Sequence, residues 1–349
     1  PDGRTVLGAT IKRDITVLRR QGIDLPDNYY DVAVAHYLLR PEGSQMLADI
    51  AAEMLQVHIH DWGVPVQTLR RGITGDDAQV AIRMASRTDA ILRLYSPLQQ
   101  SITDNGHQHL LTDIELPMIR VLADMEYAGV RIDTMLLQNI AVEMTSRIAA
   151  LEEDVRQMAG TRFNTASPAQ VGEILFGKMQ IDPKAKRTKT GAYSTTEEIL
   201  EKYRAQWPIV DAILRIRALK KLQSTYVEAL PKMVSPADGM VHTTFNQTAT
   251  ATGRLSSNNP NLQNIPIRTA EGRRIRAAFI GTSEGDKIMS CDYSQIELRL
   301  MAALSGDSVM LEAFREGKDI HRATAAKVFH ESEDAVTEDQ RRKAKTANF

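Results

Sequence analysis

The amino-acid sequence predicts a helix-rich α/β protein with more than one domain. Its 349 residues are enough for two or three domains with separate hydrophobic cores. Apolar residues recur at helical spacing through much of the first two thirds, and from about Ser235 the pattern changes to short strands and turns. Near the end, the apolar run Ile288–Cys291 passes into helical spacing from Ser294 onward, which predicts a strand followed directly by a helix.

Several helices are expected before the strand-containing part. Each follows from apolar residues spaced three or four apart, and Gly129 stops the helix that precedes it, as glycine commonly does. The polar, basic stretch 184–191 separates two of the later helices, and a strand is expected at 239–246. The expected helices cover residues 31–39, 78–95, 116–129, 135–159, 194–203 and 207–233.

One carboxylate, Asp292, stands at the predicted junction between strand and helix. Rigid backbone on both sides suits a metal ligand, because the position of such a ligand must be fixed closely. Cys291 is expected to be a core residue of the strand. Glu297 and Arg299 add charge to the helix, whose apolar positions are Ile296, Leu300, Met301 and Leu304. A solvated turn aspartate and a salt-bridged helix are the alternative interpretation.

A second group of charges lies in the last predicted helix. Thr337–Gln340 has the form of a capping box, which predicts a helix start. Arg341, Lys345 and Phe349 then recur at i, i+4 and i+8, so two cations and an aromatic ring share one face. Such a face can hold a polyphosphate with its charges and stack a base on its ring. An ordinary solvated basic face is the alternative interpretation.

Composition narrows the class of protein further. The single cysteine excludes an internal disulfide framework and is typical of a reducing cytoplasm. No apolar run approaches transmembrane length and the first residues do not resemble a signal peptide, so no membrane partner is expected. The net charge of -1 argues against general polyanion binding, yet basic residues gather in clusters that can form a local channel for phosphates. These clusters lie at 184–189, 215–221, 268–276 and 341–345.

Three ordered motifs closely resemble the family A DNA polymerases, the group of bacterial DNA polymerase I. Asp292–Arg299 (DYSQIELR) matches the first polymerase motif, and Arg341–Phe349 (RRKAKTANF) matches the opening of the second. Thr250–Ser257 (TATGRLSS), continuing through Asn261–Pro266 (NLQNIP), matches the palm sequence that touches primer and template. The resemblance extends from about Leu116 to the end of the chain.

The resemblance implies a right-hand polymerase preceded by a degenerate RNase H-like 3′–5′ exonuclease domain. The exonuclease-like part would occupy residues 1–108, and a linking helix and thumb would follow at 109–234. A partial palm with the first polymerase motif is implied at 235–330, and the start of the fingers helix at 331–349.

The implied reaction is template-directed DNA synthesis, in which the primer 3′-hydroxyl attacks the α-phosphate of a dNTP and expels pyrophosphate. Asp292 would bind two Mg²⁺ ions, with the Tyr293 carbonyl as a further ligand and Mn²⁺ as a substitute metal. Arg341 and Lys345 would hold the triphosphate, and Lys345 would also protonate the departing pyrophosphate. The implied dNTP-binding residues are Tyr293, Gln295, Glu297, His321, Arg341, Lys345 and Phe349.

Glu297 distinguishes the implied DNA polymerase from a single-subunit RNA polymerase, which shares the fold. In the DNA polymerases, the glutamate at this position closes the space beside the 2′ carbon of the sugar, so a ribonucleotide hydroxyl would clash or leave the carboxylate badly paired. An RNA polymerase has to admit that hydroxyl.

The resemblance also implies contacts with primer-template DNA. An Arg and a Gln that read minor-groove acceptors test the shape of a base pair and not its sequence. Arg217 and Lys221, one turn apart on a predicted helix, correspond to DNA-contacting residues, although plain solvated charges would account for both. The remaining implied contacts are Arg254, Asn261, Gln263 and Arg268.

The first part of the chain departs from an active nuclease. Asp14 falls where one exonuclease carboxylate is expected, but Arg83 and Arg87 occupy the positions of the tyrosine and aspartate in the last exonuclease motif. A cation in place of a metal-binding anion repels the ion that it should hold. We therefore predict an inactive remnant that serves as a scaffold. An alignment shifted by two residues would place Asp89 at the carboxylate position instead.

In the family, the helix that contains Arg341 continues beyond the position of Phe349, and a later His-Asp-Glu motif supplies the second metal-binding carboxylate. The resemblance therefore implies an active site that needs a missing C-terminal part, supplied by a complementary polypeptide. A non-catalytic fragment that grips primer-template DNA is the alternative. The implied location is the bacterial cytoplasm, in association with the nucleoid.

Overall fold

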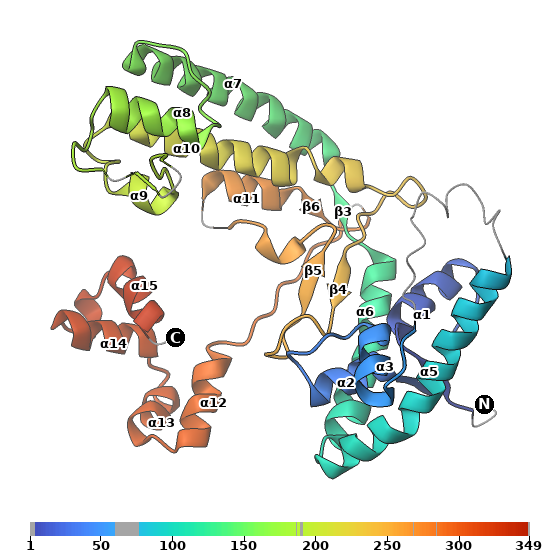
Figure 1. Cartoon of the computed structure of the whole chain (residues 1–349). Helices are drawn as coiled ribbons and strands as arrows, with labels where there is room; N and C mark the ends of the chain where they lie inside the picture. Colours follow the sequence, from blue (N-terminus) through green and yellow to red (C-terminus); the bar gives the residue numbers. More distant parts are fainter. Residues whose placement is uncertain are drawn as a thin grey trace. The chain divides into compact units, whose positions relative to one another are not determined.

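A computed structural model describes residues 4–59, 77–185, 187–188, 191–267, 269–283 and 285–347. The chain divides into two compact units, here called the N-terminal unit (Pro1–Lys287) and the C-terminal unit (Ile288–Phe349). The chain combines many helices with a few short paired strands, in agreement with the predicted helix-rich α/β class (Figure 1). None of the helices described here combines the length and apolar character needed to cross a membrane.

The first part of the N-terminal unit surrounds a parallel strand pair, β1 (Val6–Gly8) and β2 (Tyr29–Asp31). Its helices bury apolar side chains in one cluster that extends from Ile11 to Ala123. The predicted helix at 31–39 is confirmed, and the one expected at 78–95 continues to residue 104. The helices are α1 (Ile11–Arg20), α2 (Val32–Leu39), α3 (Leu47–Leu55), α5 (Asp77–Asp104), the π-helical η1 (Leu110–Glu115) and α6 (Leu116–Ala128).

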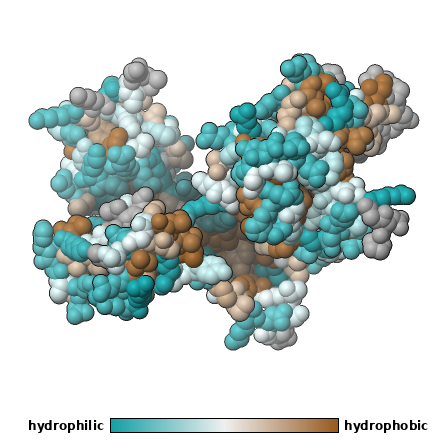
Figure 2. All heavy atoms as spheres, turned by 90° about the horizontal axis from the view of Figure 1, so that it is seen from below, coloured by the Kyte–Doolittle hydropathy of each residue, from teal (hydrophilic) through white to brown (hydrophobic). Residues whose placement is uncertain are grey.

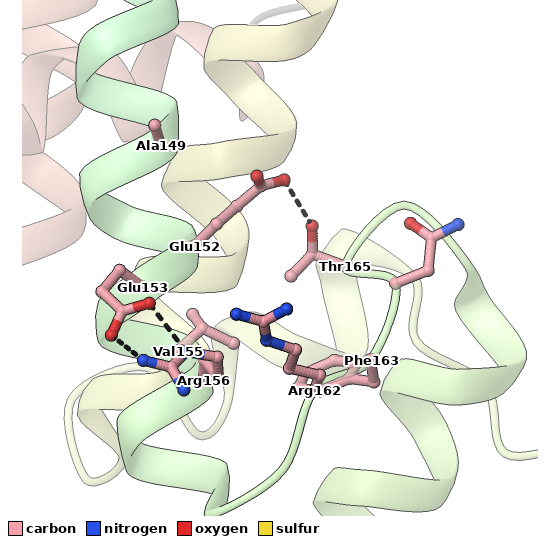
Figure 3. A pocket seen from close by; sticks show the side chains of 9 residues that line it. Ala149, Glu152, Glu153, Val155, Arg156, Arg162, Phe163 and Thr165 are labelled. Atoms are coloured by element: carbon pink, nitrogen blue, oxygen red, sulfur yellow. Dashed lines mark hydrogen bonds and ion pairs between the residues drawn. The ribbon is translucent and has the colours of Figure 1, made fainter.

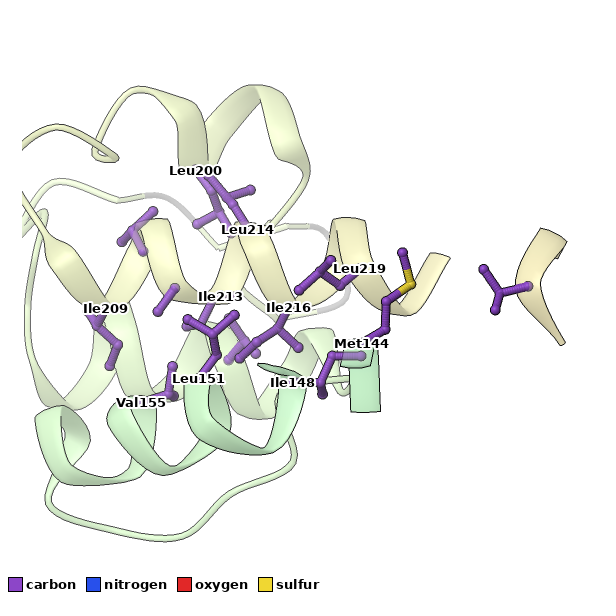
Figure 4. Close-up of a cluster of buried hydrophobic side chains, with 14 of the residues drawn as sticks. Met144, Ile148, Leu151, Val155, Leu200, Ile209, Ile213, Leu214, Ile216 and Leu219 are labelled. Atoms are coloured by element: carbon purple, nitrogen blue, oxygen red, sulfur yellow. The ribbon is translucent and has the colours of Figure 1, made fainter. Parts of the chain in front are cut away.

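The second part of this unit is built on two long helices, α7 (Thr134–Ala159) and α10 (Pro208–Leu222), which pack along each other (Figure 4). The buried positions of α7 recur three or four residues apart, so they form one apolar stripe that faces α10. These positions are Leu137, Ile140, Met144, Ile148, Leu151, Val155 and Ala159. The helix predicted at 135–159 is thereby confirmed.

Two later predictions of helix were too long. The one at 194–203 is only α9 (Glu197–Glu201), because Thr196 has an extended backbone and the oxygens of Thr195 accept hydrogen bonds from Arg217. The one at 207–233 is α-helical only from Pro208 to Leu222, and the chain then continues through a π-helical segment and a 3-10 turn. The short elements here are α8 (Pro168–Gly172), the π-helical η2 (Glu173–Lys178) and η3 (Gln223–Val227), and the 3-10 turn η4 (Leu230–Met233).

Short strands complete the N-terminal unit. The strand expected at 239–246 is confirmed at its end, where β4 (Thr244–Asn246) pairs antiparallel with β5 (Ser256–Asn258). Val241 makes isolated bridges to Val130 and Val234. The remaining elements are η5 (Leu262–Asn264), α11 (Ala270–Ala277) and the antiparallel pair β3 (Arg131–Ile132) and β6 (Phe279–Ile280).

The C-terminal unit is helical, and the predicted strand at Ile288–Cys291 is wrong. No strand pairs with this segment in the part of the chain that the structure describes, and Cys291 is exposed and not a core residue. A strand depends on hydrogen bonds to a neighbour, so an apolar run without one remains extended and hydrated. The helices are α12 (Ile296–Ser305), α13 (Ser308–Arg315), α14 (Ile320–Phe329), the 3-10 turn η6 (Glu333–Ala335) and α15 (Glu338–Ala347).

Large hydrophobic side chains remain exposed on α12. The four predicted apolar positions stay exposed, and the helix buries Leu298 and Ala302 instead. The exposed fractions of the four are 41% for Ile296, 54% for Leu300, 58% for Met301 and 87% for Leu304. Figure 2 shows that hydrophilic residues cover most of the face in view and that hydrophobic patches interrupt them.

Candidate functional site

Asp292 lies in the segment without regular secondary structure that leads into α12. Both Asp292 and Tyr293 are solvent-exposed, and Gln295 has a left-handed backbone (φ 53°) at the N-cap of the helix. The guanidinium of Arg299 donates to the Ser294 carbonyl over 2.9 Å and stacks on the Phe314 ring, 4.6 Å from its centroid. These contacts fix the turn that follows Asp292 to α12 and α13.

Glu297 occupies the first turn of α12 and is exposed. The partial positive charge at the start of a helix favours a carboxylate there. The sequence therefore places this acid at a stable position five residues after Asp292, on the helix that carries the first motif.

Asp319 connects three elements of the C-terminal unit. It is the N-cap of α14, where its Oδ1 accepts hydrogen bonds from the backbone N–H groups of His321 (3.0 Å) and Arg322 (3.2 Å). Its Oδ2 accepts from Nε of Arg341 on α15 over 2.7 Å. Gln295 donates its side-chain amide to Oδ1 over a longer 3.4 Å.

Electrostatics in this cluster favour a carboxylate and a neutral imidazole. Burial pushes the pKa of Asp319 upward, but the hydrogen bonds from Arg341 and the α14 backbone outweigh burial and leave the pKa below its ordinary value. His321 is buried, which lowers its pKa, and the charges of Arg341 and Lys345 lower it further against the attraction of Asp319. His321 can therefore act as a neutral hydrogen-bonding group near neutral pH.

The predicted capping box at the start of α15 is confirmed. Gln340 accepts hydrogen bonds from the backbone N–H and the hydroxyl of Thr337, both over 2.8 Å, and returns its own N–H to that hydroxyl over 3.3 Å. Ala344 packs into a small buried cluster with Ala325 of α14 and Val336. The close contact of these two helices holds Arg341 beside Asp319.

The structure brings several predicted site residues of the C-terminal unit together. Gln295, His321 and Arg341 meet at Asp319, and the charge of Lys345 acts on His321. Asp292 and Tyr293 precede Gln295 in the segment that leads into α12, and Glu297 follows Gln295 in the first turn of that helix. Phe349, predicted to pack on the sugar and base, lies outside the described residues.

Arg217 and Lys221 of α10 have different surroundings. The guanidinium of Arg217 donates to the carbonyl and hydroxyl of Thr195, and burial lowers its pKa. Arg217 therefore supports the segment before α9, as well as carrying a positive charge. Lys221 is exposed, one helical turn further on.

The predicted palm contacts gather around one turn. Gly253 has φ of 75° before the exposed Arg254, and the Arg254 carbonyl accepts from the Thr250 hydroxyl over 2.8 Å. The side-chain amide of Gln263 donates a hydrogen bond to the Leu255 carbonyl over 3.1 Å. Asn261 caps η5 through the Gln263 N–H, and Arg268 lies outside the described residues.

Residues from the first part of the N-terminal unit brace this turn and its strand. The buried Tyr37 of α2 donates its hydroxyl to the Thr250 carbonyl over 2.6 Å. Glu126 of α6 accepts from the Phe245 N–H of β4 over 2.7 Å and forms an ion pair with Lys12 of α1. The turn that carries Arg254 is thus fastened to the helices that precede it in sequence.

Asp14 of α1 is partly buried, which raises its pKa, while the charges of Arg13 and Arg87 oppose the shift. Asp31 lies close enough for the charge of Asp14 to raise its pKa as well. Asp89 is exposed and 3.6 Å from Arg93 on the same helix. Among the described residues, no group of three or more His, Cys, Asp or Glu side chains is arranged to hold a metal ion.

A pocket of about 450 Å³ opens between α7 and the loop that follows it (Figure 3). Glu152 is engaged by the Thr165 hydroxyl over 3.1 Å and by Lys220 over 2.6 Å. Glu153 is paired with Arg156, and this hydrogen bond lowers the pKa of Glu153 to about 2. Both carboxylates are therefore already satisfied by cations or hydroxyls of the chain.

Asp319, Tyr37 and Glu126 were not predicted as functional residues. Asp319 has a local signal that could have found it, because an aspartate directly before helical spacing is a common N-cap and it stands two residues before His321. Tyr37 and Glu126 have no such signal. Their partners Thr250 and Phe245 are more than 100 positions away in sequence.

The sequence model of the family described as DNA polymerase family A matches residues 134–349. The chain is 44% identical over 343 residues to DNA polymerase I of Geobacillus stearothermophilus, covering 97% of this chain and 38% of that protein. It is 47% identical over 260 residues to the thermostable DNA polymerase I of Thermus thermophilus, covering 74% and 31%. The chain thus spans less than two fifths of the length of these relatives.

One solved structure is similar over nearly the whole chain. It is the POL domain of Pol1 from M. smegmatis in complex with DNA primer-template and dNTP, and it superposes with a TM-score of 0.82 at 36% sequence identity. The match covers 97% of this chain and 56% of that one.

Proposed function

This chain belongs to DNA polymerase family A, and on that premise we propose that it takes part in template-directed DNA synthesis. The primer 3′-hydroxyl would attack the α-phosphate of an incoming dNTP and release pyrophosphate. The similar solved complex contains primer-template DNA and dNTP, which supports the same two partners for this chain.

The observation that best supports the proposal is the cluster around Asp319. The guanidinium of Arg341 can bind phosphate oxygens through two parallel hydrogen bonds, and Lys345 on the same helix adds a second cation. His321 offers an imidazole whose lowered pKa keeps it neutral. Together these groups would hold a triphosphate, and Lys345 would protonate the departing pyrophosphate. Gln295 and Glu297 would line the sugar side of the same site.

Asp292 and Tyr293 fit Mg²⁺ in kind, because an exposed carboxylate and a backbone carbonyl are the hard oxygen donors that this ion prefers. Two bound ions, with Mn²⁺ as a substitute, would neutralise charge on the attacking and leaving oxygens. Asp292 would position the ions, and Tyr293 would also contact the dNTP.

Two-metal transfer requires further carboxylates beside Asp292, and the described residues hold no group of three possible ligands. We infer that a complementary polypeptide segment supplies them. The exposed apolar residues of α12 agree with a surface that such a segment would cover.

Primer-template DNA would be contacted by Lys221 and Arg217 of α10 and by the turn of Arg254. Asn261 and Gln263 would contribute through the same turn, which Gln263 stabilises at Leu255. Arg268 is retained as a proposed contact from its place in the motif.

The first part of the chain would serve as a scaffold without nuclease activity. Arg87 lies close enough for its charge to act on Asp14, where a nuclease would need another carboxylate. The hydrogen bond from Tyr37 to Thr250 gives this part a supporting role at the proposed primer contact. The four-domain division at 108, 234 and 330 is part of the same proposal.

Primer extension tests the proposal. The chain is assayed alone and with a polypeptide that carries the following portion of a family A polymerase, using dNTPs and Mg²⁺. Extension only in the mixture, abolished by Asp292→Ala, is the expected result. Extension by the chain alone would refute the need for a complementary segment.

The alternative function is binding of primer-template DNA without turnover. Intact DNA affinity with no extension in any mixture would favour it. The co-location of Arg341, His321 and Asp319 favours catalysis, because a duplex-binding module has no need of a triphosphate site.

A further inference from the structure

We propose that Asp319 is a positioning residue that orients Arg341 and the start of α14 toward the incoming triphosphate. The proposal rests on the function proposed above and assigns a role to a residue outside the three motifs. A single carboxylate joins the cap of α14, the guanidinium of Arg341 and the turn at Gln295. Movement of any one of these groups would therefore disturb the other two.

The contact with Arg341 leaves the phosphate-binding end of the guanidinium available. In the part of the chain that the structure describes, only Nε of Arg341 forms a hydrogen bond, and its acceptor is Asp319. The two terminal nitrogens can then bind an anion in parallel. A long arginine side chain loses rotamer freedom when it binds, and a partner that already restrains it reduces that loss.

The contact with α14 positions His321. Oδ1 of Asp319 accepts the His321 N–H in the first turn, so the carboxylate fixes the backbone from which the imidazole projects. The same oxygen accepts the Arg322 N–H. Asp319 thus holds two groups of the proposed triphosphate site. Its Oδ1 fixes the backbone of His321, and its Oδ2 binds the guanidinium of Arg341.

A competing role for Asp319 predicts the opposite effect on triphosphate binding. If Asp319 only neutralised Arg341, its negative charge would weaken triphosphate binding, and removing the charge would strengthen that binding. Asp319→Asn separates the two roles. Asparagine caps helices as well as aspartate does. Its amide group in place of Oδ2 would meet the Nε–H of Arg341 donor to donor, so Arg341 would be released.

The test measures binding of a Mg²⁺-dNTP complex to the full chain, mixed with the complementary polypeptide, on a primer-template whose primer lacks a 3′-hydroxyl. We expect Asp319→Asn to weaken nucleotide binding roughly three- to tenfold, from the rotamer freedom returned to Arg341. Arg341→Ala should weaken it as well. The double variant should be no weaker than Arg341→Ala, because Asp319 would act through Arg341. The affinity for primer-template should not change.

Asp307→Asn is the matched control. Asp307 caps α13 through the Met310 N–H over 2.8 Å and is exposed, so this variant makes the same change at a cap in the same unit. It should leave nucleotide binding unchanged. The Nε–H resonance of Arg341 provides a second measurement on the free protein, and Asp319→Asn should speed its exchange with water.

The outcomes separate the inference from the function on which it rests. Tighter or unchanged nucleotide binding in Asp319→Asn, with binding weakened in Arg341→Ala, would overturn the positioning role alone. Equal weakening in Asp307→Asn would also overturn it, because a general loss of capping would then be the cause. No effect of Arg341→Ala, or no nucleotide binding by the unaltered chain, would overturn the proposed triphosphate site and the inference with it.

Discussion

Asp31 and Asp319 both cap helices, yet their surroundings shift their pKa values in opposite directions. Asp31 is buried in the N-terminal unit, and burial raises its pKa to about 6 against the hydrogen bonds from the N–H groups of Ile11, Val34 and Ala33. Asp319 is only partly buried and is paired with Arg341, so its pKa falls. The capping residue is the same, and the degree of burial together with the neighbouring cation decides the direction of the pKa shift.

Asp31 predicts a pH dependence of stability in the N-terminal unit. Its folded-state pKa lies above the unfolded value of 3.8, so its stabilising contribution is complete below that pH and is lost as the pH rises through about 6. The loss between pH 4 and pH 7.5 should be roughly 3 kcal/mol at most. Urea unfolding at both pH values measures it.

Asp31→Asn should remove this part of the pH dependence. Asp104→Asn, at an exposed acid near the end of α5, is the control and should retain it. Equal pH dependence in the protein and in Asp31→Asn would contradict the prediction.

Glu297 predicts the choice of sugar. We expect Glu297→Ala to raise incorporation of ribonucleotides relative to deoxynucleotides, by roughly tenfold or more, because the space beside the 2′ carbon would open. Competitive primer extension by the complemented protein measures the ratio. Glu312→Ala, at an exposed acid of α13, should leave the ratio unchanged. Unaltered sugar discrimination in Glu297→Ala would refute the role.

At the scale of elements, local signals predicted helices better than strands. Thr337 and Gln340 specify the start of α15 through contacts within four residues, and the sequence contains both partners. Ile288–Cys291 has the composition of a strand, but pairing depends on a distant segment that composition does not provide. Asp292 was therefore expected on rigid backbone between a strand and a helix. In the structure it lies instead in an exposed segment before α12.

The link from α2 to the turn before β5 predicts an effect over a long sequence distance. Tyr37→Phe removes the hydrogen bond to the Thr250 carbonyl and should lower the free energy of unfolding by about 1 kcal/mol. Backbone amides of residues 250–254 should then exchange faster with solvent, which mass spectrometry can measure. Tyr127→Phe, at a side chain that is 41% exposed, is the control. Unchanged amide exchange at residues 250–254 in Tyr37→Phe would contradict a supporting role for this hydrogen bond.

At the scale of the whole molecule, the two units have very different cores. The N-terminal unit buries large aliphatic side chains throughout α7 and α10, whereas the buried cluster of the C-terminal unit consists of Ala325, Val336 and Ala344. Buried apolar area is the main stabilising contribution to a fold, so the C-terminal unit should open more readily.

Hydrogen exchange of the unliganded chain should therefore differ between the units. Amides in the middle of α7 and α10 should exchange at least about a hundredfold more slowly than those of α14, corresponding to about 3 kcal/mol. Both regions experience the same conditions in one experiment, so each serves as the reference for the other. Equal protection of α14 and α7 would show that this small cluster is not the limiting factor.

Asp292, His321 and Arg341 lie within 50 positions of one another in sequence and share the C-terminal unit. The motifs did not predict how the first part of the chain supports β4. That support consists of single contacts between residues more than 100 positions apart, such as Phe245 with Glu126, and no periodicity or spacing marks them.

The ion pair of Lys12 and Glu126 limits how far this polypeptide can be shortened. A polypeptide that began at α6 would lack Lys12. Glu126, whose side chain is only 10% exposed, would then have lost this counter-ion. Removing one member of a buried pair costs about 3–5 kcal/mol. Shortening the chain from its beginning would therefore weaken the attachment of β4, the strand that these early helices support.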